Sequence, residues 1–342
     1  MSPKSFTVLL ILTITSVFAA LMMVAIDYKG GPTKSVGEFV LPNLYGKVNN
    51  VEKLVIEHAK GKITLISNEG IWTVEEKSNY SARTAKIKRT ILGLAQLKFS
   101  EPKTKLKENY SKLELLDPTN KLSKSKRIYL FDKNGKTIGD IIVGKRRPSL
   151  TGTPGGALYV RRPGESQTWL AEGDVEISKN TANWLERKII NLSFKRVKKV
   201  FIQHEDGETL EIYKNTLKDS QFLIKNIPSN KKIASETEPS TFGKALQNLM
   251  LENVKKEASF HTLSRKNVLI ANFYTFDGLS IHLQLSKQDG KFWIKIEASG
   301  KNKEAHVITE RTKGWVYQIA EYSASVLIRR MKDLVMDAKS ES

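Results

Sequence analysis

The 342-residue sequence predicts an α+β protein in which an N-terminal transmembrane helix precedes two tandem copies of a mostly antiparallel sheet packed with helices. Three observations support this prediction: an uncharged N-terminal run of 21 residues, short alternating apolar segments separated by glycine turns, and an internal repeat at an offset of 146 residues. The predicted divisions are a tail and anchor (1–26), a linker (27–50), a first copy (51–191), a second copy (192–335) and a frayed tail (336–342).

The apolar run from Phe6 to Ile26 is long enough to span the roughly 30 Å hydrocarbon core of a bilayer as a helix. A cleavable signal peptide is the alternative, because Val17-Phe18-Ala19 resembles a cleavage site and Lys4 precedes the run. Cleavage there would leave the apolar stretch Leu21–Ile26 at the new terminus, which favours the anchor. A short tail before a first apolar segment usually stays in the cytoplasm. We therefore expect a single-pass protein of the bacterial inner membrane with a periplasmic body.

The following residues, 27–50, predict a linker because Gly30, Gly31 and Pro32 occur together and no long periodicity follows. The repeat begins after it. Val51–Gly61 matches Val197–Gly207 at five of eleven positions. Because two copies are too few for a solenoid, each copy is expected to hold its own core.

Two further blocks occur in the same order in both halves. Arg127–Lys145 resembles Asn267–Lys287, and the Asn-Gly and Asp-Gly pairs within these blocks predict matching hairpin turns. Thr181–Trp184 (TANW) resembles Thr312–Trp315 (TKGW).

In the first copy, apolar residues at Ile87, Ile91, Leu94 and Ala95 predict a helix over 82–97, with Ser81 as its N-cap. Alternation predicts strands at 54–58, 63–66, 71–74, 128–131, 138–143, 157–160 and 168–171.

In the second copy, Pro239 predicts the start of the matching helix. Its expected apolar stripe comprises Phe242, Leu246, Leu249 and Met250. Strands are predicted at 268–273, 280–285 and 292–296, and a closing helix at 314–334.

The composition is basic and free of cysteine. Lys and Arg number 56 against 36 Asp and Glu, a formal net charge of +20, so attraction to anionic lipid or an acidic polymer is one interpretation and a solvated lysine-rich surface is the other. The missing cysteines exclude disulfides and thiol catalysis. No nucleic-acid-binding signature occurs, so no nucleic-acid partner is predicted.

No catalytic, cofactor or metal site is predicted, and we expect a protein that is not an enzyme. A Gly-x-Ser-x-Gly elbow is absent, and Gly144-Lys145 lacks the surrounding pattern of a phosphate-binding loop. An unrecognised hydrolase with a dispersed site remains an alternative. No histidine has a partner at metal-ligand spacing; they are His58, His204, His261, His282 and His306.

A cationic connection between two predicted strands is the candidate site for an anion or a partner. The glycine- and proline-rich segment 143–156 is expected to be this loop, and arginine can form bidentate contacts with carboxylate or phosphate. The alternative is a solvated hairpin. The candidate residues are Lys145, Arg146, Arg147, Arg161 and Arg162.

Several segments together resemble a known bacterial family, the domain of unknown function numbered 4340. The landmarks are Ile71–Glu75, Leu115–Pro118, Ile142–Arg146, Tyr159–Arg161 and Trp169-Leu170, and the resemblance covers about 51–192.

The resemblance implies no established activity and no catalytic residues. Such proteins are typically membrane-anchored and are often encoded beside ABC transporter subunits and a gliding-motility-type auxiliary protein. It therefore implies a non-enzymatic accessory or scaffold protein of the envelope with an ABC-type transporter as partner. A basic module that binds anionic lipid or cell-wall polymer is the alternative.

Overall fold

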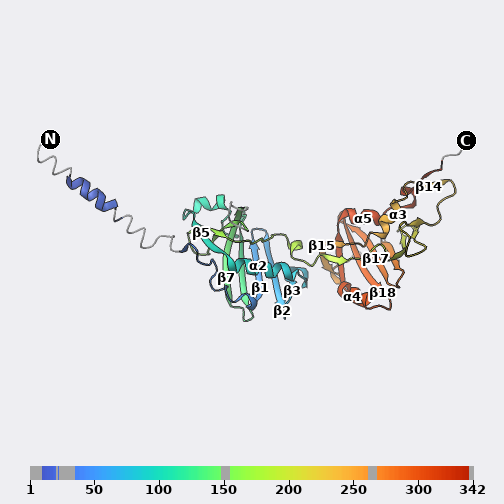
Figure 1. Cartoon of the computed structure of the whole chain (residues 1–342), viewed down its shortest axis with the longest axis horizontal. Helices are drawn as coiled ribbons and strands as arrows, with labels where there is room; N and C mark the ends of the chain where they lie inside the picture. Colours follow the sequence, from blue (N-terminus) through green and yellow to red (C-terminus); the bar gives the residue numbers. More distant parts are fainter. Residues whose placement is uncertain (1–9, 21, 23–34, 148–154, 261–267, 339–342) are drawn as a thin grey trace. The chain divides into compact units, whose positions relative to one another are not determined.

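The computed structural model describes residues 10–20, 22, 35–147, 155–260 and 268–338, and these form an α+β protein with two large, mainly antiparallel sheets (Figure 1). The chain divides into two compact units. Unit 1 comprises 1–75 and 82–184, and unit 2 comprises 76–81 and 185–342. This division falls seven residues before the expected limit at 191.

Unit 1 holds eight strands of the first large sheet, in the order β3-β2-β1-β6-β7-β8-β9-β5. They are β1 (Val51–His58), β2 (Gly61–Asn68), β3 (Ile71–Val74), β5 (Lys98–Pro102), β6 (Lys126–Asp132), β7 (Thr137–Arg147), β8 (Ala157–Arg161) and β9 (Thr168–Glu172). The short strand β4 (Tyr80–Ser81) falls within 76–81 and so belongs to unit 2.

The helix of unit 1 is α2 (Thr84–Gln96), which lies along the sheet (Figure 1). The predicted stripe of Ile87, Ile91, Leu94 and Ala95 is buried, as its helical spacing indicated. The predicted N-cap was wrong. Ser81 belongs to β4, and the capping position falls on Arg83, whose side chain makes no capping hydrogen bond.

Residues 35–50 are part of unit 1, so the linker prediction was wrong for them. Val40 and Leu44 are fully buried, and Phe39 forms a β-bridge with Lys98. The local sequence lacked periodicity because these residues fill the end of a core built by distant strands. Residues 27–34 of the predicted linker lie outside the described part of the chain.

Unit 2 holds a second nine-stranded sheet in the order β10-β15-β19-β18-β17-β16-β11-β12-β13, and a separate pair β14-β20. Its strands are β10 (Lys188–Ile190), β11 (Val197–Gln203), β12 (Thr209–Tyr213), β13 (Leu223–Ile224), β14 (Lys231–Ile233), β15 (Leu249–Lys256), β16 (Leu269–Thr275), β17 (Ser280–Gln288), β18 (Lys291–Ser299), β19 (Trp315–Ile319) and β20 (Val335–Asp337). Its helices are α3 (Glu238–Gly243), α4 (Lys303–Thr312) and α5 (Glu321–Leu327).

The two sheets follow one strand order. The run β2-β1-β6-β7-β8-β9-β5 corresponds to β12-β11-β16-β17-β18-β19-β15, with the strands in the same sequence along the chain. Even a register shift recurs, between Val51 and Lys53 and again between Val197 and Lys199, at the offset of 146 seen in the sequence.

Three details of unit 2 correct the sequence predictions. The helix predicted to begin near Pro239 is the short α3, Glu238–Gly243, and Leu249 and Met250 belong to β15. The predicted helix 314–334 is instead β19, α5 and a short 3-10 helix, because Trp315–Ile319 pairs as a strand with β15 and β18. The TANW and TKGW segments are not equivalent, since the first follows β9 and the second leads into β19, its counterpart.

The C-terminal end of the chain differs from expectation, and the N-terminal apolar run is only partly described. Val335–Asp337 pairs with Lys231–Ile233, so the start of the predicted frayed tail is a strand; 339–342 lie outside the described residues. Residues 10–20 of the predicted anchor are helical, and its remainder is largely undescribed. Among the described residues, no helix has the length and apolarity needed to cross a membrane.

Candidate functional site

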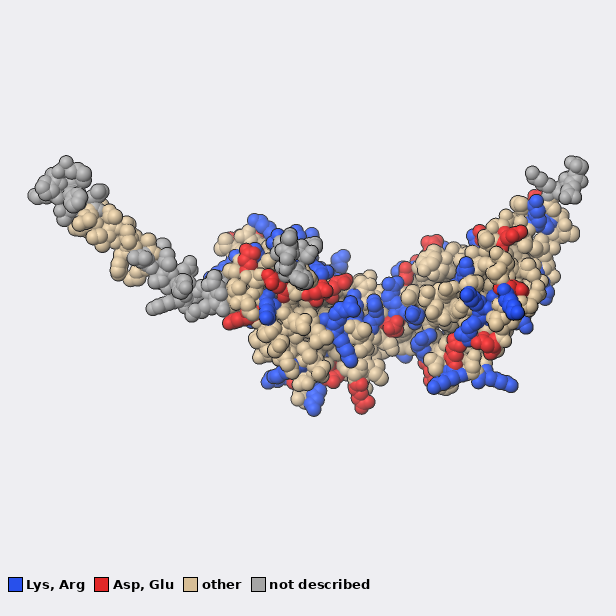
Figure 2. Space-filling view, viewed as in Figure 1, with Lys and Arg blue, Asp and Glu red and all other residues tan. Residues whose placement is uncertain are grey.

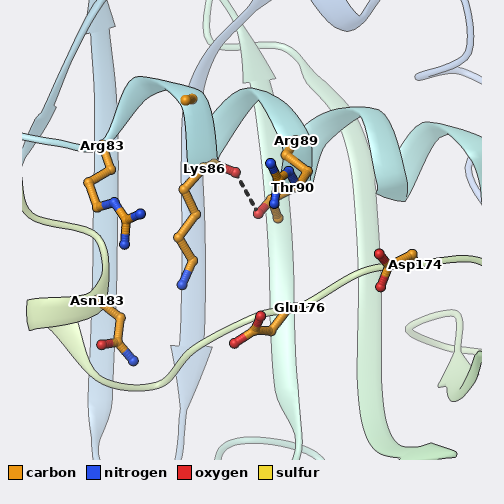
Figure 3. Close-up of a pocket in the computed structure, with 8 residues that line it drawn as sticks. Arg83, Lys86, Arg89, Thr90, Asp174, Glu176 and Asn183 are labelled. Atoms are coloured by element: carbon orange, nitrogen blue, oxygen red, sulfur yellow. Dashed lines mark hydrogen bonds between the residues drawn. The ribbon is translucent and has the colours of Figure 1, made fainter. Parts of the chain in front are cut away.

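The candidate site is a pocket of about 400 Å³ in unit 1, between α2 and residues 173–184, which we call the strap. The strap follows β9 and runs beside α2 (Figure 3). At one end Gly93 permits close approach, since a Cβ there would lie 2.6 Å from the carbonyl oxygen of Asp174. At the other end the amide of Arg83 donates to the carbonyl of Trp184 at 2.8 Å. These two contacts position the strap along the helix.

Local hydrogen bonds also shape the far end of the strap. The Asn180 side chain accepts from the amide of Ala182 at 2.9 Å, which caps the 3-10 helix Thr181–Asn183. The indole of Trp184 is fully buried and donates to the carbonyl of Ser178 at 3.0 Å. The strap is therefore held in place by its own turn as well as by its contacts with α2.

Three cations line the pocket: Arg83, at the capping position before α2, and Lys86 and Arg89, on the polar side of the helix. The side chains of Arg83 and Lys86 point from the helix toward the strap (Figure 3). The Lys86 ammonium lies 5.0 Å from the centre of the Trp184 ring, a cation–π contact. No ion pair between described residues neutralises any of the three.

Two carboxylates lie on the strap side. Asp174 is already paired with Arg146 at 2.7 Å, whereas Glu176 forms no ion pair with a described residue. The three cations therefore face one uncommitted carboxylate, and the pocket carries excess positive charge. Arginine forks in a concave site suit carboxylate or phosphate groups, so the arrangement can bind an anion.

The predicted cationic loop is not a loop where it is described. Lys145, Arg146 and Arg147 are the last residues of β7, and pairing with β8 continues to Arg147↔Ala157. Three of the six glycines and prolines that suggested a loop, Pro148, Gly152 and Pro154, fall within 148–154, outside the described residues. Lys145 and Arg146 are exposed and Arg147 is half-buried.

Arg161 and Arg162 lie at the other end of β8, where Arg161 pairs with Ile142. Arg161 is 5% exposed and forms an ion pair with Asp117 at 3.0 Å. The guanidinium of Arg162 donates to the carbonyl of Val40 at 3.2 Å. The structure therefore does not bring the five predicted cations together, and both of these arginines are committed to internal contacts.

The positive charge of the chain is also widely spread. Figure 2 shows Lys and Arg interspersed with Asp and Glu over the visible face of each unit. A single large basic patch is not visible there. This agrees with the interpretation of the net charge as a solvated lysine-rich surface.

The histidines show no metal-binding arrangement in the described residues, among which no group of three or more His, Asp or Glu could hold a metal ion. His58 ends β1 and His204 directly follows β11, the corresponding strand of unit 2, and each lies next to a hairpin turn. His261 lies outside the described residues.

Sequence reasoning missed the pocket cations although a signal was present. The helix Thr84–Gln96 contains no acidic residue, so the cations opposite its apolar stripe could not be neutralised within it. The strap gave no comparable signal, because its irregular backbone has no periodicity.

The fold and the pocket define a two-unit α+β protein with related sheets and a hollow lined by cations in its first unit. The chain belongs to the family described as Domain of unknown function (DUF4340), whose model matches residues 72–265, more than half of the chain. The match begins at 72 rather than the expected 51 and continues past 192 into unit 2, so it is not confined to one sheet. Neither a curated protein nor a solved structure matches the chain.

Proposed function

We propose that this protein is a non-enzymatic accessory protein of the bacterial envelope whose unit 1 binds an acidic segment of a partner protein in the cationic pocket. The apolar segment 6–26 attaches it to the membrane in this proposal, with the body on the periplasmic side. The partner is an ABC-type transporter complex. That partner follows from the family resemblance described above rather than from the pocket itself.

The observation that carries the proposal is the unneutralised group of Arg83, Lys86 and Arg89. Isolated surface cations contribute little to binding, but a concave site that desolvates both partners strengthens each contact. The two arginines can each grip a carboxylate through two nitrogens. Glu176 on the strap repels misplaced acidic groups and so favours one orientation of the incoming segment.

The test is in-cell cross-linking of a C-terminally tagged full-length chain, followed by gentle solubilisation and identification of co-purifying proteins. We expect envelope proteins, with transporter subunits among them, and loss of their recovery in Arg83→Glu/Arg89→Glu. Both positions are exposed, so the substitutions are compatible with folding.

The matched control is Lys133→Glu/Lys136→Glu in the exposed β6–β7 turn, which makes the same change in net charge. The proposal is overturned if both double variants recover the same partners as the unaltered chain, or if both lose them equally.

The anionic-lipid or polymer alternative predicts a different outcome. Binding that depends on total charge would weaken to the same extent in both double variants and would fall with added salt.

A further inference from the structure

A second group of cations lies at the end of the unit 1 sheet where β1 ends and β6 begins. His58 is the last residue of β1, and the rung Glu57↔Arg127 places Lys126 beside it. Lys60 follows in the β1–β2 turn, and its amide donates to Nδ1 of His58 at 3.3 Å. The end of the sheet therefore presents a histidine and two lysines from three different backbone segments.

The strap adds a lysine to this group. The ammonium of Lys126 donates to the carbonyl of Ile177 at 3.3 Å, and the ammonium of Lys179 donates to the carbonyl of Lys124. We call Lys60, Lys124, Lys126 and Lys179 the lysine cluster. None of its members also lines the cationic pocket, although the strap contributes to both.

The cluster is held together by neutral carbonyls rather than by carboxylates. No ion pair between described residues includes any of its four lysines. The Glu114 carboxylate is the nearby acidic group that acts on Lys126 and Lys179, and it only partly opposes the lowering of their pKa values by burial. The unliganded protein therefore keeps several like charges in proximity, at a cost that an anion would remove.

The pKa shifts of Lys126, Lys179 and His58 have the direction expected for partly buried groups with like charges nearby. Burial, then Lys179, lowers the pKa of Lys126. Burial also lowers the pKa of Lys179, with Lys124 and Lys60 acting in the same direction against Glu114. The pKa of His58 is lowered by burial, then by Lys179 and Lys60.

We propose that the lysine cluster, with His58, binds a phosphomonoester or free phosphate. Lysine ammonium groups are compact point charges that suit a small multivalent anion, and the cluster lacks the arginine forks of the pocket. Because Nδ1 of neutral His58 accepts the Lys60 amide, its proton resides on Nε2, which supplies one more donor. The site is independent of the proposed partner-binding function.

One of the five predicted site residues, Lys145, lies at the same end of the sheet as the lysine cluster. Lys126 pairs with Val143, so Lys145 follows directly beyond that rung of β7. The predicted cationic segment therefore reaches the same end of the sheet as the lysine cluster, although its arginines are used elsewhere.

The test uses the full-length chain in neutral detergent with two probes, inorganic phosphate and dihexanoylphosphatidic acid. Histidine ring signals are followed by NMR across a pH titration, and His58→Asn assigns the signal of His58. Free His58 should titrate below the ordinary value of 6.5. A bound phosphate should raise that pKa, since a nearby anion favours the imidazolium form.

The informative variant is Lys60→Ala/Lys124→Ala, because both residues are exposed and neither side chain makes a hydrogen bond with a described residue. It should weaken binding by at least about tenfold, as expected for losing hydrogen bonds between charged groups. The control Lys133→Ala/Lys136→Ala, at the opposite end of β6, should bind like the unaltered chain.

The two probes separate the sources of the phosphate. Tighter binding of dihexanoylphosphatidic acid indicates a lipid headgroup, and equal or tighter binding of inorganic phosphate indicates a soluble ligand; both support the site. The proposal is overturned if neither probe shifts the His58 signal, or if the two double variants weaken binding equally. Failure of the phosphate site and failure of the partner-binding proposal can be told apart, because the lysine cluster and the cationic pocket are altered by different substitutions.

Discussion

Arg161 illustrates how a residue that resembles a binding cation can be an internal one. Its guanidinium stacks on Tyr110 at 4.8 Å and is paired with Asp117, which is 57% exposed. A further contact is longer, to the carbonyl of Leu115 at 3.4 Å. These contacts join β8 to the irregular segment before β6, so the residue serves packing.

We expect Arg161→Ala to lower the free energy of unfolding by about 3 kcal/mol, because a large buried side chain and its ring contact are lost and a cavity remains. Lys145→Ala, at an exposed position, should change it by less than about 0.5 kcal/mol. Urea unfolding of the full-length chain measures both. Equal effects of the two substitutions would contradict the assignment of Arg161 to the core.

Gly144 has a comparable structural role. A Cβ at this position would lie 2.2 Å from the carbonyl oxygen of Leu113 and 2.8 Å from that of Glu114. Only glycine allows β7 and that segment to approach this closely. Gly144, Leu115 and Arg161 are all landmarks of the family resemblance, and their grouping at one place shows that packing accounts for them.

At the scale of elements, α2 shows when a periodic pattern is reliable. Its apolar residues recur at helical spacing, and the sheet buries the stripe that this spacing creates. Its boundaries were less predictable than its existence, since Ser81 is used by β4.

Adjacent residues of α2 provide a prediction. Ile91 is 3% exposed and Leu92 is 48% exposed. We expect Ile91→Ala to lower the free energy of unfolding by about 2–4 kcal/mol through the cavity it creates, and Leu92→Ala by less than about 1 kcal/mol. Thermal or urea unfolding compares the two variants. A larger effect at Leu92 would mean that the helix faces the other way.

The segment 314–334 shows the opposite case. Val316, Ile319 and Leu327 can be placed on one face of a helix, yet Trp315–Ile319 is a strand between β15 and β18. The residue pairs Asn253↔Gln318 and Ile294↔Tyr317 show that this strand is paired with β15 on one side and β18 on the other. Those partners are distant in the chain, so tertiary pairing overrode an ambiguous local pattern.

At the scale of the whole molecule, unit 2 includes a short segment from the first third of the sequence. Residues 76–81 belong to unit 2, although the residues on either side belong to unit 1. Within unit 2, Tyr80 packs edge-on against Trp315 with ring centres 5.0 Å apart, and Lys77 donates to the side chain of Asn253 at 2.8 Å. Burial raises the pKa of Tyr80 to about 12.

We expect Tyr80→Ala to lower the free energy of unfolding of unit 2 by about 3 kcal/mol, because a buried ring is removed. Hydrogen exchange should become faster in β15 and β19, which hold Asn253 and Trp315. Tyr322→Ala is the control, since Tyr322 is also in unit 2 but is 75% exposed. Unchanged exchange in both variants would exclude a core role for Tyr80.

The α+β class, α2 and most strands could be predicted from the chain alone, because alternation and helical spacing are local properties. The 146-residue offset was also visible, and the shared register shift after Val51 and Val197 gives it a structural counterpart. The cationic pocket and the lysine cluster could not be predicted in this way. Each requires the irregular strap, 173–184, to lie beside residues more than 50 positions earlier, and no local pattern specifies such long-range packing.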